Sequence, residues 1–304
     1  MRVQVDSLGA RPCYRLEDGC YSGTAIATTG TIMSYCHLTS GGKTLNFSQR
    51  EIDVIRGGVD GASCSPTIAA TNRDTIGVYV GSTGFFFLRN QHLPGIADVT
   101  AGFGPAGAGW VAIAGDWDGD GDDTIGLYNP ANGFFFLRNS NTPGAADVVF
   151  GFGPPGTGWV PVAGNWDGVG GDSIGLYDPG TGAFFLKNSN SPGAADTFFT
   201  FGPGGAGVLP VVGDWNNDGS TTIGIYVRST GAFFLRNSNT PGAADTFFTF
   251  GAANGGYVPL AGEWDNTGGE SIGLYDLPNG AFFLKNTNAG GNADLLFNFG
   301  PTGP

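Results

Sequence analysis

Positive charge and long apolar segments are scarce in this sequence. Only 13 Lys and Arg residues stand against 26 Asp and Glu, which gives a formal net charge of −13 and a pI near 4.3. Nucleic-acid binding requires clustered cations that neutralise phosphates, so this class of partner is excluded. No apolar run reaches the roughly 18 residues of a membrane span. The first residues, 1–6, also lack the apolar core of a signal peptide, which indicates a truncated or processed start.

Cysteine is confined to one end of the chain. The four cysteines are Cys13, Cys20, Cys36 and Cys64, and none shows the paired spacing of a zinc or redox motif. Two disulfides are therefore predicted, with all three possible pairings open. Disulfides persist outside the reducing cytoplasm, so the pattern predicts an extracellular or secreted protein.

Glycine, proline and phenylalanine are abundant instead. The 56 glycines and 18 prolines favour tight turns, while the 24 phenylalanines need buried surface. Because aromatic and β-branched residues favour strands, the composition predicts an all-β protein of many short strands.

A repeat of 49 residues dominates the sequence after residue 64. The motif of Ile, Gly, an aliphatic residue and Tyr recurs without insertion at residues 76–79, 125–128, 174–177, 223–226 and 272–275. A fixed period of this length is typical of arrays whose units hide their apolar faces against one another. The sequence therefore divides into a segment at 1–64 and five repeats at 65–304.

One repeat is long enough for four antiparallel strands. In the second repeat these are expected at residues 110–118, 123–128, 134–139 and 146–152, with Gly-, Asn- and Pro-rich turns between them. Four strands per repeat predict the blade of a β-propeller, here with five blades. The consecutive aromatics at 134–136 indicate a sheet covered on both faces by neighbouring blades.

The first repeat departs from this pattern. Ile68 occupies the position of Trp117, Trp166, Trp215 and Trp264, so no typical first strand is recognisable. Closure of the ring must then use a divergent strand near residues 62–71. The alternative is an open repeat array whose edges are joined between subunits.

The loop after the first strand of each repeat carries the strongest chemical signal. In residues 116–123, oxygen-bearing side chains alternate along a glycine-bent loop, as they do in calcium sites. The predicted structural calcium ligands are Asp116, Asp118, Asp120 and Asp123 in the second repeat, and Asp214, Asn216 and Asp218 in the fourth. Weaker sites are predicted at Asn165 and Asp167, and at Glu263 and Asp265. The alternative without metal is a set of side-chain caps on tight turns.

These loops and their spacing resemble the calcium-binding propeller repeats of the FG-GAP and VCBS type. The resemblance covers about 240 residues. It implies a propeller fold, bound Ca²⁺ and a secreted protein of the bacterial cell surface. It does not specify the function, because such repeats serve adhesion, carbohydrate binding and spacing alike.

Two further periodic sets favour structural roles. A cation ends the third strand of every repeat, nine residues before an aspartate; the pairs are Arg89 and Asp98, Arg138 and Asp147, Lys187 and Asp196, Arg236 and Asp245, and Lys285 and Asp294. We expect cross-strand ion pairs rather than a ring of cations for an anionic ligand. The repeated tryptophans are expected to pack between blades, rather than to form sugar-stacking platforms.

The amino-terminal segment resembles the end of a catalytic domain in secreted reprolysin-like metalloproteases of the metzincin clan. The resemblance is carried by Gly30-Thr-Ile-Met33-Ser-Tyr-Cys36, with Met33 as the methionine of the turn below the zinc site, and by a short helix at 48–56. The HExxHxxGxxH motif that binds zinc is absent, and the only histidines are His37 and His92. Zinc proteolysis by this chain is therefore not expected.

Taken together, these features predict a non-catalytic, extracellular, calcium-stabilised binding or structural repeat protein. Its partners would be copies of itself, in a surface filament, or an extracellular glycan or protein. One alternative is a fragment of a secreted zinc metalloprotease whose propeller anchors it to substrate. A second is a lectin-like propeller, and a glycosidase is disfavoured because no unique carboxylate pair stands out.

Overall fold

The computed structural model describes residues 73–300. The chain divides into two compact units, Met1–Thr71 and Asn72–Pro304, and the described residues all belong to the second. They form nineteen strands joined by turns and bends, which confirms the all-β prediction. Within this range no helix has the length and hydrophobicity needed to cross a bilayer.

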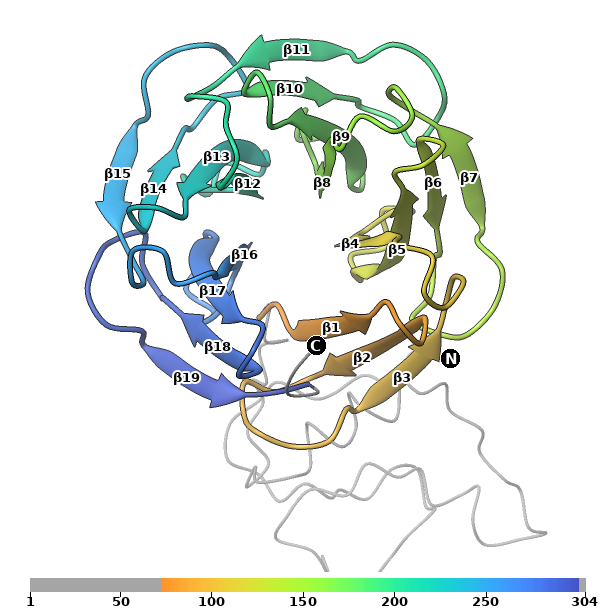
Figure 1. The fold of residues 1–304 in the computed structure, drawn as a ribbon, viewed down its shortest axis with the longest axis horizontal. Coiled ribbons are helices and arrows are strands. Elements are labelled where there is room, and N and C mark those ends of the chain that lie inside the picture. Colours follow the sequence, from red (N-terminus) through yellow and green to blue (C-terminus); the bar gives the residue numbers. More distant parts are fainter. Residues whose placement is uncertain (1–72, 301–304) are drawn as a thin grey trace, which may run out of the picture. The chain divides into compact units, whose positions relative to one another are not determined.

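The strands form five antiparallel blades arranged in a ring (Figure 1). The described part of the first blade contains β1 (Ile76–Val80), β2 (Phe85–Arg89) and β3 (Val99–Gly102). The second contains β4 (Val111–Gly115), β5 (Thr124–Asn129), β6 (Phe134–Leu137) and β7 (Val148–Gly151). The third contains β8 (Val160–Gly164), β9 (Ser173–Asp178), β10 (Ala183–Leu186) and β11 (Thr197–Thr200). The fourth contains β12 (Val208–Gly213), β13 (Thr222–Val227), β14 (Ala232–Leu235) and β15 (Thr246–Thr249); the fifth contains β16 (Val258–Gly262), β17 (Ser271–Asp276), β18 (Ala281–Leu284) and β19 (Leu295–Asn298).

The predicted blade agrees with the observed one. All four strands expected in the second repeat are present, each shorter than or shifted slightly from its predicted range. The strand expected near residues 62–71 to complete the first blade lies outside the described residues.

Five apolar clusters lie between neighbouring blades and hold the ring together. The second strand of each complete blade is buried almost throughout, and Tyr128, Tyr177 and Tyr226 are among the largest fully buried side chains. Aromatic rings from the third and fourth strands stack beside them; the ring centroids of Phe135 and Phe150 are 5.7 Å apart. Each cluster combines residues of two adjacent blades, so no blade buries its faces alone.

The ring closes within one chain. One cluster combines Ile76 and Val78 of the first blade with Trp264, Phe282 and Phe297 of the fifth. Figure 1 shows these two blades side by side. The described residues thus form a closed propeller, and not the open array that was the alternative.

The two faces of the third strand are not equally buried along its aromatic run. Phe135 and Leu137 are fully buried between blades, whereas Phe134 at the start of β6 is 41% exposed. Phe136, on the same face as Phe134, is partly buried and stacks on Trp110 with a centroid distance of 4.5 Å. The expectation that neighbouring blades cover both faces therefore holds for the middle of the strand and fails at its start.

The glycine of the repeated motif is required by close packing. A Cβ at Gly175 would lie 2.8 Å from Leu186 Cδ2 and 2.9 Å from Val162 Cγ2, in the strands on either side. We expect Gly175→Ala to lower the free energy of unfolding by about 1–3 kcal/mol, because both neighbours must move. Gly81→Ala is the matched control, because its Cβ would meet only Tyr79 at 3.6 Å. Equal urea midpoints for the two variants would contradict this prediction.

Candidate cation-binding loops between the blades

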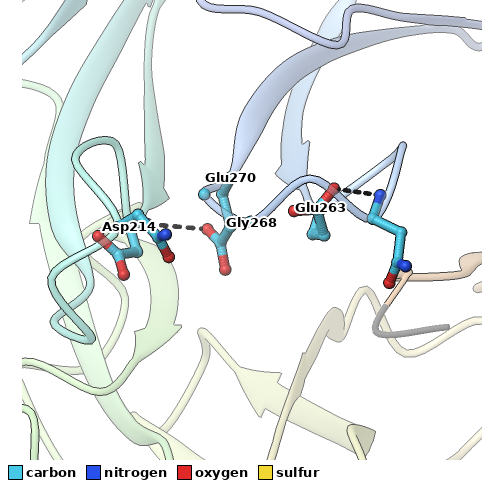
Figure 2. Close-up of a pocket in the computed structure, with 7 residues that line it drawn as sticks. Asp214, Glu263, Gly268 and Glu270 are labelled. Atoms are coloured by element: carbon cyan, nitrogen blue, oxygen red, sulfur yellow. Dashed lines mark hydrogen bonds between the residues drawn. The ribbon is translucent and has the colours of Figure 1, made fainter. Parts of the chain in front are cut away.

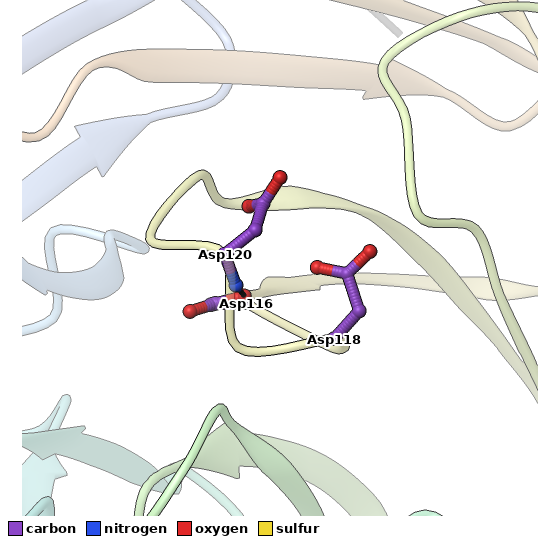
Figure 3. A group of neighbouring side chains, drawn as sticks. All are labelled: Asp116, Asp118 and Asp120. Carbon is purple, nitrogen blue, oxygen red and sulfur yellow. Dashed lines mark hydrogen bonds between the residues drawn. The ribbon is translucent and has the colours of Figure 1, made fainter.

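The loop between β4 and β5 brings together three of the predicted calcium ligands. Asp116, Asp118 and Asp120 each place one carboxylate oxygen within 4.8 Å of the other two (Figure 3). Gly119 and Gly121 make the bend possible, since their φ angles of 77° and 89° are costly for other residues. A hard cation prefers such a set of oxygens, so the loop geometry fits Ca²⁺.

The same loop is also held by its own hydrogen bonds. The Asp116 Oδ1 atom accepts from the N–H groups of Gly119 at 2.8 Å and Asp120 at 3.1 Å, and its Oδ2 accepts from Gly121 at 3.0 Å. Asp116 therefore caps the turn, as the interpretation without metal expected. Among the described residues, no hydrogen bond reaches the Asp118 carboxylate, which leaves its oxygens available to a cation.

Asp123, the fourth predicted ligand of this loop, lies outside the three-carboxylate group. The residues at its repeat position in other blades have a role that the sequence did not reveal. Asp172 Oδ2 accepts the N–H of Asp116 in the preceding blade at 3.1 Å, and the N–H of Asp172 donates to the Asp116 carbonyl at 2.6 Å. We call this reciprocal pair the inter-blade clamp.

The inter-blade clamp recurs around the ring. The N–H of Asn165 donates to the Thr221 hydroxyl oxygen at 3.0 Å, and the N–H of Thr221 donates to the Asn165 carbonyl at 2.8 Å. In the next pair of blades, the N–H of Asp214 donates to Glu270 Oε2 at 3.0 Å, and the N–H of Glu270 donates to the Asp214 carbonyl at 3.1 Å. One sequence signal could have revealed the clamp: every repeat has an oxygen-bearing side chain at the position of Asp172.

The fifth and first blades are joined by the same device. Asp74 Oδ2 accepts the N–H of Glu263 at 2.7 Å, and the Asp74 N–H donates to the Glu263 carbonyl at 2.8 Å. His92 Nε2 lies 2.8 Å from the Asp74 carbonyl oxygen, and the ring is 5.7 Å from that of Trp264 in the fifth blade. In later blades an asparagine fills the place of His92 and donates to the equivalent carbonyl; these are Asn141, Asn190, Asn239 and Asn288.

Several carboxyl groups occupy the clamp position of the repeat, and their pKa values are raised. Burial and then the charges of Asp172 and Asp74 raise the pKa of Asp123 to about 7. Burial also raises the pKa of Asp172 to about 6 and that of Glu270 to about 8, with further contributions from neighbouring carboxylates. The pKa of Asp74 is raised for the same reasons. These carboxyl groups lie close enough to disfavour one another's ionisation.

In the fourth blade, the loop of Asp214 forms the second predicted calcium site. The Asp214 oxygens accept the N–H groups of Asp218 at 3.0 Å and Gly219 at 2.8 Å. The Asn216 side-chain amide donates to Asp218 at 2.9 Å. The loop has the same cap as the second blade, and its calcium binding stays a prediction.

The two loops of the weaker predicted calcium sites, which we call the degraded loops because they lack some of the carboxylate ligands of residues 116–120, are held mainly by turn hydrogen bonds. Asn165 Oδ1 and Asp167 Oδ1 both accept the N–H of Val169. In the fifth blade, Glu263 Oε1 accepts the N–H groups of residues 265–267, and Asp265 accepts both the N–H and the hydroxyl of Thr267. These contacts account for the turns of both loops, and calcium binding at the weaker sites stays a prediction.

A cavity of about 290 Å³ lies beside the clamp between the fourth and fifth blades (Figure 2). The residues lining it are Asp214, Asn217, Glu263, Asn266, Gly268, Gly269 and Glu270. Glu263 is only 9% exposed, yet its Oε2 atom has no hydrogen-bond partner. Glu263 replaces the aspartate or asparagine of the other loops, but the replacement alone does not predict an unpaired buried oxygen.

The periodic cations serve their own loops. Arg138 Nε donates to the Thr142 carbonyl at 2.6 Å, and its guanidinium lies 3.8 Å from Asp147. Ion pairs of 3.0, 3.8 and 3.2 Å join Arg89 to Asp98, Lys187 to Asp196 and Lys285 to Asp294. The expectation of structural ion pairs is confirmed in these four blades.

The repeated tryptophans pack between blades, as expected. Trp117, Trp166 and Trp264 are at most 8% exposed. The indole N–H groups of Trp166 and Trp264 donate to backbone carbonyls at 3.4 and 3.0 Å. These three side chains cannot act as platforms for a sugar ring without leaving the core.

The predictions for the amino-terminal segment fall outside the described residues. They concern the disulfides of Cys13, Cys20, Cys36 and Cys64, the turn at Met33, and the helix at 48–56.

Comparison with known proteins gives one distant structural match. No family model and no curated protein matches the chain. A crystal structure of BBS1N in complex with ARL6DN, soaked with mercury, matches with 9% sequence identity and a TM-score of 0.36. The match covers 70% of this chain and 61% of that chain, and a similarity this low carries no inference about function.

Proposed function

We propose that this chain is a non-catalytic, extracellular propeller of the FG-GAP and VCBS type that binds a protein partner or further copies of itself. One observation carries the non-catalytic part of the proposal. The charged residues of the described blades recur at equivalent positions and make the same structural bonds in blade after blade. Catalysis needs a distinct constellation of residues, and most charged side chains in residues 73–300 are instead used for the structural bonds of the repeat.

The outer strands support a role in binding. The same repeat position carries an exposed apolar side chain in four blades: Val149 is 51% exposed, Phe198 and Phe247 are each 62% exposed, and Leu296 is 63% exposed. These residues lie on β7, β11, β15 and β19, the outermost strands in Figure 1. Such regular apolar positions suit a repetitive protein surface better than a glycan, because Trp117, Trp166 and Trp264 are buried and cannot stack on a sugar. The proposal includes self-association because an exposed apolar side chain recurs at the same repeat position in four blades of one ring.

Calcium is the cofactor that the geometry of residues 116–120 favours. Three carboxylate oxygens lie within 4.8 Å of one another, and one of these side chains has no hydrogen-bond partner among the described residues. An extracellular loop of this kind binds Ca²⁺ with a dissociation constant of about 10⁻⁴ to 10⁻³ M. Bound calcium would stabilise the loop from which the clamp to Asp172 starts.

We expect millimolar calcium to raise the melting temperature relative to EDTA. At a calcium concentration about ten times the dissociation constant, binding stabilises the folded protein by about 1.4 kcal/mol. This corresponds to an increase of roughly 3–6 °C in melting temperature for a protein of this size. D118N/D120N should lose most of this increase, and D167N in a degraded loop is the control. An equal increase in D118N/D120N and the unaltered protein would reject this calcium site.

Light scattering in the same two buffers tests the binding mode. A mass near 31.2 kDa in both buffers would reject self-assembly and leave a separate partner to be found. A larger species that loses mass in F198S/F247S would place self-assembly on the outer strands.

A further inference from the structure

The cavity between the fourth and fifth blades differs from the calcium loops because two separate blades line it. Asp214 belongs to the loop after β12, whereas Glu263 and Glu270 belong to the loop after β16. In Figure 2, Glu270 lies between Asp214 and Glu263. The cavity therefore lies at the contact between blades, beside one inter-blade clamp.

Glu263 is the unusual group of this cavity. Its equivalents Asp116 and Asp214 use both carboxylate oxygens to accept loop N–H groups. The longer Glu263 side chain accepts all of its loop N–H groups at Oε1. Its Oε2 is left buried without a partner, which is costly for a carboxylate unless a bound group compensates.

Glu270 contributes a second carboxylate to the same cavity. Its Oε2 accepts the N–H of Asp214 at 3.0 Å, and that clamp leaves Oε1 for another contact. Asp214 adds negative charge, although its own oxygens are occupied by loop N–H groups. Three carboxyl groups thus line a cavity that contains no cationic side chain.

We propose that this cavity binds a hydrated divalent cation through Glu263 Oε2 and the Glu270 carboxylate. Two carboxylates with several retained waters are the usual environment of Mg²⁺ in proteins, and Ca²⁺ tolerates the same ligands. A volume of about 290 Å³ accommodates the ion with its waters. The cation would supply the missing partner of Glu263 and neutralise the charge beside the clamp.

This site goes beyond the proposed function. Its ligands come from one of the two loops in which only weaker calcium binding was predicted, and Asp118 and Asp120 take no part in it. Loss of calcium binding at residues 116–120 would therefore leave this site intact, and loss of cation binding at Glu263 and Glu270 would leave the calcium loop of the second blade intact.

Binding of Mn²⁺, counted by electron paramagnetic resonance on the full chain, tests the proposal. E263Q and E270Q keep a side-chain carbonyl for the loop N–H groups and for the clamp, so both variants should fold. We expect each to weaken one class of bound Mn²⁺ by at least 10-fold. D172N is the matched control, because Asp172 makes the same clamp between other blades, and D118N/D120N should retain this class.

Equal binding isotherms for the unaltered protein, E263Q and E270Q would overturn the proposal, as would the absence of any bound Mn²⁺. A measurement without variants covers the case in which they misfold. Mn²⁺ should broaden the indole N–H resonance of Trp264, next to Glu263, more than that of Trp166 in a degraded loop. Equal broadening of the two resonances would also count against the site.

Discussion

Phe282→Ala is expected to lower the free energy of unfolding by about 3–5 kcal/mol. The Phe282 side chain is 2% exposed, and its ring lies 4.5 Å from that of Tyr275 and 5.5 Å from that of Phe297. These residues share a cluster with Ile76 of the first blade. The substitution therefore leaves a cavity at the contact where the ring closes.

Phe184→Ala is the matched control for this prediction. Phe184 is fully buried, stacks on Phe199 at 5.8 Å, and lies between blades that follow one another in sequence. Urea unfolding should show a single transition and a similar loss for both variants. A loss below about 1 kcal/mol for Phe282→Ala alone would mean that the first and fifth blades do not pack together in solution.

Raising the pH from 5 to 9 in EDTA is expected to destabilise the propeller. The pKa values of Asp172, Asp123 and Glu270 are raised to about 6, 7 and 8, from 3.8 for aspartate and 4.5 for glutamate. The folded protein therefore holds protons that the unfolded chain releases, so stability falls as the pH rises through this window. The pKa values of Asp218, Asp265 and Asp294 are lowered, so these groups titrate below it.

Melting temperatures measured between pH 5 and 9 test this dependence. We expect a decrease of about 3–6 °C, allowing for partial exposure of these groups to solvent. D123N/E270Q should flatten the curve, because neither amide side chain titrates. A melting temperature that is constant or rises across the window in the unaltered protein would contradict the prediction.

The sequence was sufficient to predict the propeller because its signals repeat. One strand pattern seen five times at a constant spacing determines both the blade and the number of blades. Strand ends were less certain, since Asp118 and Asn139 belong by composition to either a strand or a turn. The exposure of Phe134 was missed because an aromatic run does not reveal how far a neighbouring blade extends.

The candidate site was only partly predictable from the sequence. The alternating oxygens of Asp116, Asp118 and Asp120 are neighbours along one loop, so local spacing was enough to bring them together. The partners of Asp172 and Glu270 lie in other blades, and the period alone does not show which positions of adjacent repeats meet. Asp123 was grouped with its own loop for this reason. The unpaired oxygen of Glu263 depends on side-chain length and could be seen only in three dimensions.

The inter-blade clamps differ greatly in the length of chain that they close. Three of them join residues 56 positions apart, whereas the clamp between Glu263 and Asp74 joins residues 189 positions apart. The entropy lost in closing a loop grows with its length, and contacts between distant residues slow folding. The sequential blades can therefore assemble in chain order, while the contact made by Asp74 must wait for nearly all of them. Until that last step, the apolar edges of the first and fifth blades stay unprotected, and a newly made chain is most prone to aggregate during this interval.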